Sequence, residues 1–121
     1  MNLVIDIGNS FTKTAIFDHK ELIKANVFEN FSEKELEAYL KKYAVKACII
    51  SSVASKNKTL HNFLKRLLVF IELNANTLIP IKNNYSTPET LGNDRLANVI
   101  GAHSLFPNQN VLVIDAGTCL K

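Results

Sequence analysis

The 121-residue sequence is poor in residues that interrupt regular structure, with four glycines and three prolines. Together with a hydrophobic content of 47%, this scarcity excludes a disordered or low-complexity chain and predicts a globular protein with a substantial core. No apolar run approaches the length of about 18 residues that a membrane-spanning helix needs. The N-terminus also lacks the basic and apolar regions of a signal peptide. We therefore expect a cytoplasmic protein without a membrane segment.

Cysteine and net charge are also low. Cys48 and Cys119 both lie in strand-like apolar runs, so we interpret them as reduced, buried thiols rather than as a disulfide or a metal-binding pair. The net charge of +3 argues neither for nor against a polyanionic partner. Acidic residues are absent between Glu37 and Glu72, where the basic residues are Lys41, Lys42, Lys46, Lys56, Lys58, Lys65 and Arg66. Because no aromatic or glycine-rich recognition pattern accompanies them, we interpret them as solvated lysines and expect no nucleic-acid partner.

The most informative pattern occurs twice. Residues 3–10 read Leu-Val-Ile-Asp-Ile-Gly-Asn-Ser, and residues 112–119 read Leu-Val-Ile-Asp-Ala-Gly-Thr-Cys. An apolar strand that ends in a carboxylate and a glycine turn can hold a metal-bound phosphate. The carboxylate faces the cation, and a turn without a Cβ lets backbone N–H groups approach the phosphate oxygens. A single copy is more often a strand that simply ends in a turn, but the second copy favours an internal duplication.

The intervening sequence predicts alternating strands and helices. Three strand-like runs separated by short turns predict an antiparallel meander over residues 2–7, 11–17 and 22–28. A capping box formed by Ser32 and Glu35 opens the first helix. Apolar periodicity then predicts further elements in the order strand, helix, strand, at 47–53, 57–71 and 77–81. A third helix containing Leu96, Val99 and Ile100 precedes the repeated strand at 111–115.

This order predicts a ribonuclease H-like α/β unit, in which a mixed sheet of three antiparallel and two parallel strands has flanking helices. Two such units in tandem, each opening with strand-Asp-x-Gly, describe the actin-like ATPases, which hold nucleotide phosphates between the two glycine turns. We therefore expect a first domain over residues 1–110. Residues 111–121 are expected to open a truncated second domain.

Several side chains suit phosphoryl transfer, which needs positioned phosphates, neutralised charge and an aligned acceptor hydroxyl. Asp6 and Asp115 suit Mg²⁺, which takes a few carboxylates and keeps much of its hydration. Possible donors to phosphate oxygens follow each aspartate, namely Asn9, Ser10 and Thr118. Lys13 could place a positive charge near the first turn, or it could be a solvent-facing strand residue.

Asp94 and Arg95 form a third group, beside Gly92 at the start of the third predicted helix. The carboxylate could hold an acceptor hydroxyl while the guanidinium binds a carbonyl or carboxylate of the same substrate. Alternatively, Asn93 or Asp94 caps the helix and Arg95 is a surface residue, which is the reading that spacing alone favours.

The sequence resembles type III pantothenate kinase over its whole length. The residues that carry this resemblance are Asp6-Ile7-Gly8-Asn9-Ser10 with Lys13, Tyr85-x-x-Pro88-x-x-Leu91-Gly92-x-Asp94-Arg95-x-Ala97, Gly101-Ala102 and Asp115-Ala116-Gly117-Thr118. The resemblance implies an ATP-dependent kinase that phosphorylates pantothenate in the first step of coenzyme A biosynthesis. It also implies a homodimer that uses Mg²⁺ and a monovalent cation, K⁺ or NH₄⁺.

The resemblance assigns a role to each group of residues. The first turn, with Asp6, Gly8, Asn9, Ser10 and Lys13, is expected to bind ATP phosphates. Asp94 is the expected general base, and Tyr85, Gly92 and Arg95 are expected to line the pantothenate pocket with it. Asp115, Gly117 and Thr118 match the second phosphate and cation region.

Departures from the family pattern are few. Ser10 replaces the more usual Thr, and Cys119 replaces an expected Ala. The chain also lacks a second domain, so we expect it to have little kinase activity alone. A non-enzymatic transcription accessory protein on the same fold is the alternative, as is a superfamily member acting on a sugar or polyphosphate. Tyr85, Asp94 and Arg95 favour the pantothenate kinase, because a regulator has no need of an acceptor-activating carboxylate.

Overall fold

The computed structural model describes residues 1–52, 58–67 and 69–115. The chain forms two compact units, Met1–Leu73 and Asn74–Lys121, which are described separately below. In the ranges described, no helix is both long enough and apolar enough to cross a membrane.

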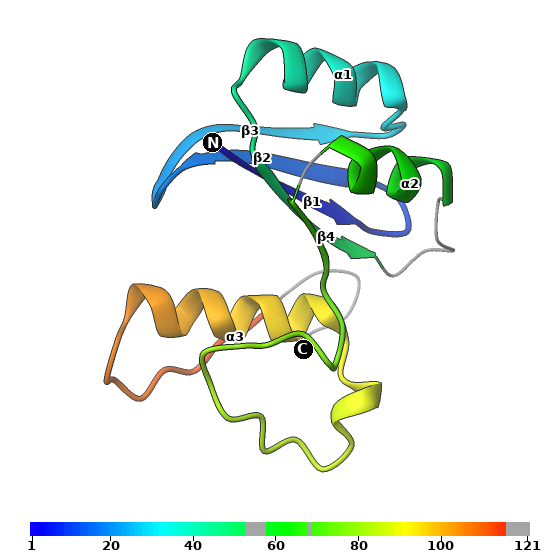
Figure 1. The fold of residues 1–121 in the computed structure, drawn as a ribbon. Coiled ribbons are helices and arrows are strands. Elements are labelled where there is room, and N and C mark those ends of the chain that lie inside the picture. The colour runs from blue at the N-terminus through cyan, green and yellow to red at the C-terminus, as the bar shows by residue number, and fades with distance from the viewer. Residues whose placement is uncertain (53–57, 68, 116–121) are drawn as a thin grey trace. The chain divides into compact units, whose positions relative to one another are not determined.

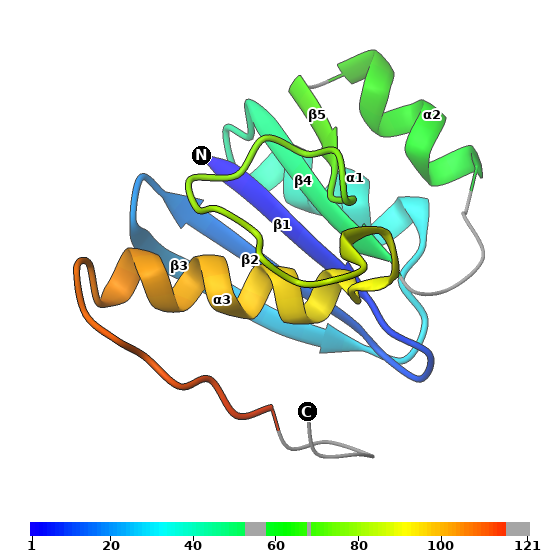
Figure 2. The same ribbon diagram turned by 90° about the horizontal axis from the view of Figure 1, so that it is seen from below.

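A five-stranded mixed sheet forms the first unit, with the strand order β3-β2-β1-β4-β5 (Figure 2). β1 (Asn2–Ile7), β2 (Thr12–Asp18) and β3 (Glu21–Phe28) pair antiparallel as a meander. β4 (Ala47–Ser52) pairs parallel with β1, and β5 (Val69–Glu72) pairs parallel with β4. The predicted sheet of three antiparallel and two parallel strands is confirmed, and it is consistent with a ribonuclease H-like unit.

Helices α1 (Glu33–Lys42) and α2 (Lys58–Leu67) cover the same face of this sheet (Figure 1). Because successive side chains of a strand point to opposite faces of a sheet, every second residue of each strand points to that face. The buried core combines side chains from strands and helices, with Leu3, Ile5, Ile16, Cys48 and Ile50 from strands and Leu36, Tyr39, Leu60 and Leu64 from helices. Leu36 and Tyr39 of α1 and Leu60 and Leu64 of α2 thus supply the helical half of the core.

The predicted capping box and the predicted buried thiol are both present. The Ser32 backbone N–H donates a hydrogen bond of 2.9 Å to the Glu35 carboxylate. Hydrogen bonds from the Ser32 side chain and backbone lower the pKa of the exposed Glu35 carboxyl below its ordinary value. Cys48 is a free, buried thiol, and its desolvation raises its pKa to about 12. Cys119 lies outside the described residues.

The fifth strand differs from the prediction. α2 ends at Leu67 rather than at residue 71, and the strand is Val69–Glu72 rather than 77–81, which forms no strand. Val69–Glu72 alternates between exposed and half-buried side chains, and its backbone pairs with β4 in parallel register. The spacing of apolar residues typical of a helix continues to Ile71, but backbone pairing with β4 makes residues 69–72 a strand. Within 77–81, Pro80 has no backbone N–H to donate to a neighbouring strand.

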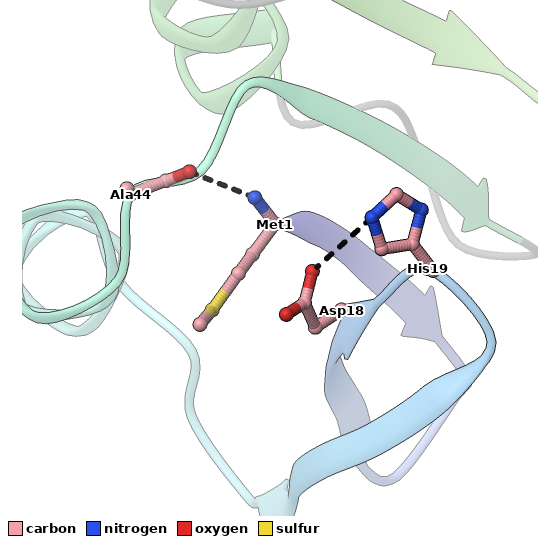
Figure 3. A network of polar contacts seen from close by, with 4 residues as sticks. All are labelled: Met1, Asp18, His19 and Ala44. Atoms are coloured by element: carbon pink, nitrogen blue, oxygen red, sulfur yellow. Dashed lines mark hydrogen bonds and ion pairs between the residues drawn. The ribbon is translucent and has the colours of Figure 1, made fainter.

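The start of β1 is held by backbone contacts that Figure 3 shows in part. The Met1 amino group donates to the Ala44 carbonyl at 2.9 Å. The Met1 carbonyl in turn accepts from Lys46 N–H at 2.9 Å.

At the β2–β3 turn, His19 adopts a left-handed φ of 52° and lies 4.0 Å from the Asp18 carboxylate. The short turn predicted between the second and third strand-like runs is thus confirmed.

The second unit contains a short 3₁₀ helix, η1 (Pro88–Thr90), and α3 (Asn93–Leu105), which is the third predicted helix. The strand predicted at 111–115 is not formed, and these residues have no regular secondary structure. A strand requires a hydrogen-bonded neighbour, and no strand occurs between residues 74 and 115 to supply one. Leu112 and Ile114 are accordingly exposed. The domain boundary expected at residue 110 stays a prediction.

Candidate active site

The first Asp-x-Gly motif forms a tight turn after β1. The Gly8 N–H donates to the Phe11 carbonyl at 3.0 Å. A Cβ at position 8 would lie 3.2 Å from the same carbonyl oxygen, which is closer than an ordinary van der Waals contact. Glycine therefore keeps this turn compact, while Asn9 and Ser10 at its tip are exposed to solvent. Their amide and hydroxyl groups are accessible to a ligand.

Asp6 lies in the middle of a row of polar residues that crosses three strands. It pairs with Lys13 of β2 in antiparallel register and with Ser51 of β4 in parallel register. Directly paired residues point to the same side of a sheet. Because the neighbouring Ile5 is buried under the helices, Asp6 faces the opposite side. Lys13, Asp6 and Ser51 therefore form a row on the face that α1 and α2 leave uncovered.

Exposure decreases along this row. Lys13 is exposed, Asp6 is half-buried and Ser51 is only 9% exposed. Lys13 is thus solvent-facing and lies on the same face as Asp6, and its role beside the phosphates stays a prediction. Within the described parts of the chain, the buried Ser51 Oγ has no hydrogen-bond partner.

Sequence motifs do not single out Ser51. The apolar run before it, Cys48-Ile49-Ile50, is typical of a buried strand. The two serines that follow this run indicate only the end of that strand. The signal that finds Ser51 is the parallel register with β1, which aligns it with Asp6. Register across a helical crossover is not encoded in the local pattern.

The groups around the first turn fit a magnesium–nucleotide. Mg²⁺ is usually held by one or two carboxylates together with substrate phosphates, rather than by a cage of protein ligands. Asp6 offers one carboxylate, Lys13 a positive charge, and the compact Gly8 turn an approach for phosphate oxygens. The Ser51 hydroxyl, which has no hydrogen-bond partner among the described residues, adds a donor on the same face. Oxygen and ammonium groups of this kind match phosphate and a hard cation.

A cavity of about 340 Å³ lies within the second unit. Three of the residues predicted from the sequence line it together, namely Tyr85, Arg95 and Asp115. The other lining residues are Ile81, Lys82, Asn83, Asn84, Leu91, Leu96, Asn98, Val99 and Val113. Such a mixture of apolar walls with a few charged and amide groups suits a small molecule that has both an aliphatic body and polar ends.

Asp94 lies at the start of α3, next to the cavity-lining Arg95. Its Oδ1 accepts the Arg95 backbone N–H at 2.9 Å, which satisfies one of the free donors of the first helical turn. The N-cap itself is Gly92, so neither Asn93 nor Asp94 occupies that position. A side-chain carbon at position 92 would collide with Asp94 Oδ1. Glycine is therefore required for Asp94 to adopt this conformation.

The predicted residues thus separate by unit. Asp6, Gly8, Asn9, Ser10 and Lys13 gather in the first unit around the end of β1. The second unit contains Tyr85, Arg95 and Asp115 in its cavity, with Gly92 and Asp94 at the start of α3. Gly117 and Thr118 lie outside the described residues.

Comparison with known proteins gives one consistent answer. Type III pantothenate kinases from Phocaeicola vulgatus and Bacteroides fragilis are 48% and 44% identical to the chain, each over 121 residues. The enzyme from Christiangramia forsetii is 46% identical over 123 residues. Each alignment covers 99% of this chain and 50% of the relative, so the chain spans about half the length of the curated relatives it matches. The sequence model of the family "Type III pantothenate kinase" matches residues 2–121. The chain therefore belongs to the type III pantothenate kinase family.

Proposed function

We propose that this chain forms part of an ATP-dependent kinase that phosphorylates pantothenate. The observation that carries the proposal is the cavity lined by Tyr85, Arg95 and Asp115, within a sequence that matches the pantothenate kinase family from residue 2 to residue 121. Pantothenate has a carboxylate, an amide and hydroxyl groups around a branched aliphatic centre. These groups complement the apolar walls, the guanidinium and the amides that line the cavity.

The proposed roles follow from the chemistry of each side chain. Asp94 accepts the proton of the pantothenate hydroxyl, which increases the nucleophilicity of that oxygen. Arg95 binds the carboxylate or a carbonyl of the same substrate through its guanidinium fork. The first turn and Lys13 position the ATP phosphates. Asp6 in the first unit and Asp115 in the second would each offer a carboxylate to Mg²⁺, which would neutralise phosphate charge.

Further properties of the whole enzyme belong to the same proposal. We expect it to be a cytoplasmic homodimer that depends on K⁺ or NH₄⁺. The remaining half of the relatives' length would supply further contacts to both substrates. For this reason the 121-residue chain by itself should phosphorylate pantothenate very slowly or not at all. Measurable turnover by this chain alone would contradict that expectation.

The test uses a chimera in which the C-terminal half of the Bacteroides fragilis relative follows residue 121, here called the completed chain. Asp94→Asn keeps the shape of the side chain but removes the base. We expect it to lower kcat by roughly 10² to 10⁴, the range typical of general-base removal. Asp18→Asn, in the exposed β2–β3 turn, serves as the matched control and should leave kcat unchanged. Near-normal turnover of Asp94→Asn would exclude Asp94 as the base.

Arg95→Ala tests substrate binding separately. Loss of a charge-assisted pair should raise KM for pantothenate by tenfold or more, as expected for about 1.5–3 kcal/mol. KM for ATP should change little. An unchanged KM for pantothenate would remove Arg95 from the pocket.

A further inference from the structure

We infer that Ser51 is a positioning residue of the phosphate site. Its hydroxyl donates a hydrogen bond to the Asp6 carboxylate when a magnesium–nucleotide is bound, which orients that carboxylate toward the cation. This inference rests on the proposed function for the identity of the ligand. It adds a residue from β4 to a site that the sequence motif confines to β1 and the turn that follows it.

The first argument is geometric. Asp6 and Ser51 are direct partners in the parallel register of β1 and β4, so both side chains point to the same side of the sheet. Neighbouring strands lie about 4.8 Å apart. At that spacing, rotation of the two short side chains brings a hydroxyl and a carboxylate within hydrogen-bond distance. The nearby residue Ser52 pairs with Ile7 instead and faces the opposite side.

The second argument is energetic. Ser51 is 9% exposed, and within residues 1–52, 58–67 and 69–115 its Oγ has no hydrogen-bond partner. A buried hydroxyl without a partner costs about 1–3 kcal/mol. The preceding residues of β4 on the same face, Ala47 and Ile49, are apolar. Packing alone would therefore favour an apolar residue at position 51. A group that destabilises the ligand-free protein is expected where it acts in binding.

These arguments predict opposite effects of Ser51→Ala on folding and on binding. In the 121-residue chain, the substitution removes an unsatisfied donor, so the midpoint of urea unfolding should be unchanged or higher. In the completed chain, calorimetric titration with Mg-ATP should give a Kd about tenfold higher, because a hydrogen bond to a charged group is lost. The KM for pantothenate should stay within about twofold, since the role inferred for Ser51 is confined to the phosphate site.

Two further variants separate the hydroxyl from local packing. Ser51→Thr retains the donor and should restore most of the Mg-ATP affinity. Ser52→Ala, on the other face of the same strand, should bind Mg-ATP like the parent. An unchanged Kd for Mg-ATP in Ser51→Ala would overturn the inference. So would a lower unfolding midpoint in Ser51→Ala together with an equal loss of Mg-ATP affinity in Ser52→Ala, because Ser51 would then be merely structural.

The measurement also separates this inference from the proposed function. If the completed chain binds Mg-ATP but does not phosphorylate pantothenate, the proposed function fails, and Ser51 is still judged by the Kd values. If the completed chain phosphorylates pantothenate and Ser51→Ala matches the parent in Kd, only the role of Ser51 fails. A completed chain that binds no Mg-ATP would contradict both.

Discussion

Removing the Tyr39 hydroxyl should destabilise the first unit by about 2 kcal/mol. This hydroxyl joins α1 to the meander, because it shares a hydrogen bond of 2.8 Å with Thr14 Oγ1 and accepts one of 2.6 Å from Asn26 Nδ2. Thr14 is only 3% exposed. In Tyr39→Phe its hydroxyl loses this partner, which for a buried group costs about 1–3 kcal/mol. The half-buried Asn26 amide can form a hydrogen bond with water instead, so the loss of its bond to Tyr39 adds only about 0.5 kcal/mol.

A double-mutant cycle isolates the Tyr39–Thr14 bond. Thr14→Val removes the threonine hydroxyl while retaining its shape and should cost about 1 kcal/mol, since Tyr39 keeps its bond to Asn26. The double variant should cost less than the sum of the single variants by about 1 kcal/mol. Tyr43→Phe is the matched control, because its ring stacks on Tyr39 outside this network. It should remain within about 0.5 kcal/mol of the parent.

Urea unfolding followed by circular dichroism gives these free energies. Amide hydrogen exchange of β1 and β2 reports on the first unit by itself, which matters because the chain forms two units. The reasoning would be refuted if Tyr39→Phe changed the free energy of unfolding by less than about 0.5 kcal/mol, the level of a neutral surface change. Additive losses in the cycle would equally exclude an energetic link between α1 and β2 through this bond.

Three further predictions concern the core, the capping box and the buried thiol. Leu64→Ala in the fully buried core should cost about 2–5 kcal/mol in urea unfolding, whereas Leu78→Ala, at a fully exposed position, should stay within about 0.5 kcal/mol. Because the pKa of Glu35 is lowered, its capping contribution is fully present above the ordinary value of 4.5 and is lost as the pH falls through the folded-state pKa. Protection factors of the α1 amides, which correct for the intrinsic pH dependence of exchange, should therefore fall in that range, and Glu35→Gln, which cannot titrate, should show no such fall. Cys48, whose pKa is raised to about 12, should resist iodoacetamide at pH 8 until the chain unfolds, as peptide mass mapping can show. Rapid labelling of the native chain would contradict its burial.

Local pattern predicted those parts of the fold in which neighbouring segments pair. The meander and the capped first helix depend on short turns and on residues close in sequence, such as Ser32 and Glu35. The position of β5 could not be predicted in this way. Its apolar residues continue the helical period of α2 to Ile71, and only pairing with β4 makes them a strand. Likewise, the pattern at 111–115 specifies an apolar strand, but no described neighbour pairs with it.

In the candidate site, too, the sequence predicts what depends on nearby residues and misses what depends on distant ones. Asp6 and Lys13 could be placed on one face from the short β1–β2 turn, because antiparallel register is set by turn length. Ser51 could not, since its alignment with Asp6 depends on a crossover that includes a helix. Asp94 and Arg95 were recognisable as a pair beside a glycine, but the cavity that joins Arg95 to Asp115 is formed by side chains 20 residues apart in sequence.

The central place of β1 in the sheet has a consequence for synthesis. β1 is made first, yet it has a neighbour on each side, and its second partner ends at Ser52. A ribosome adding about 5–20 residues per second takes roughly one to five seconds to go from Phe28 to Ser52. During that interval β1 presents an open strand edge, and the cover over Leu3 and Ile5 is complete only after α2, which follows β4 in the sequence. The period of exposure to aggregation is thus set by the speed of translation, and nascent-chain chaperones have most to protect within that span.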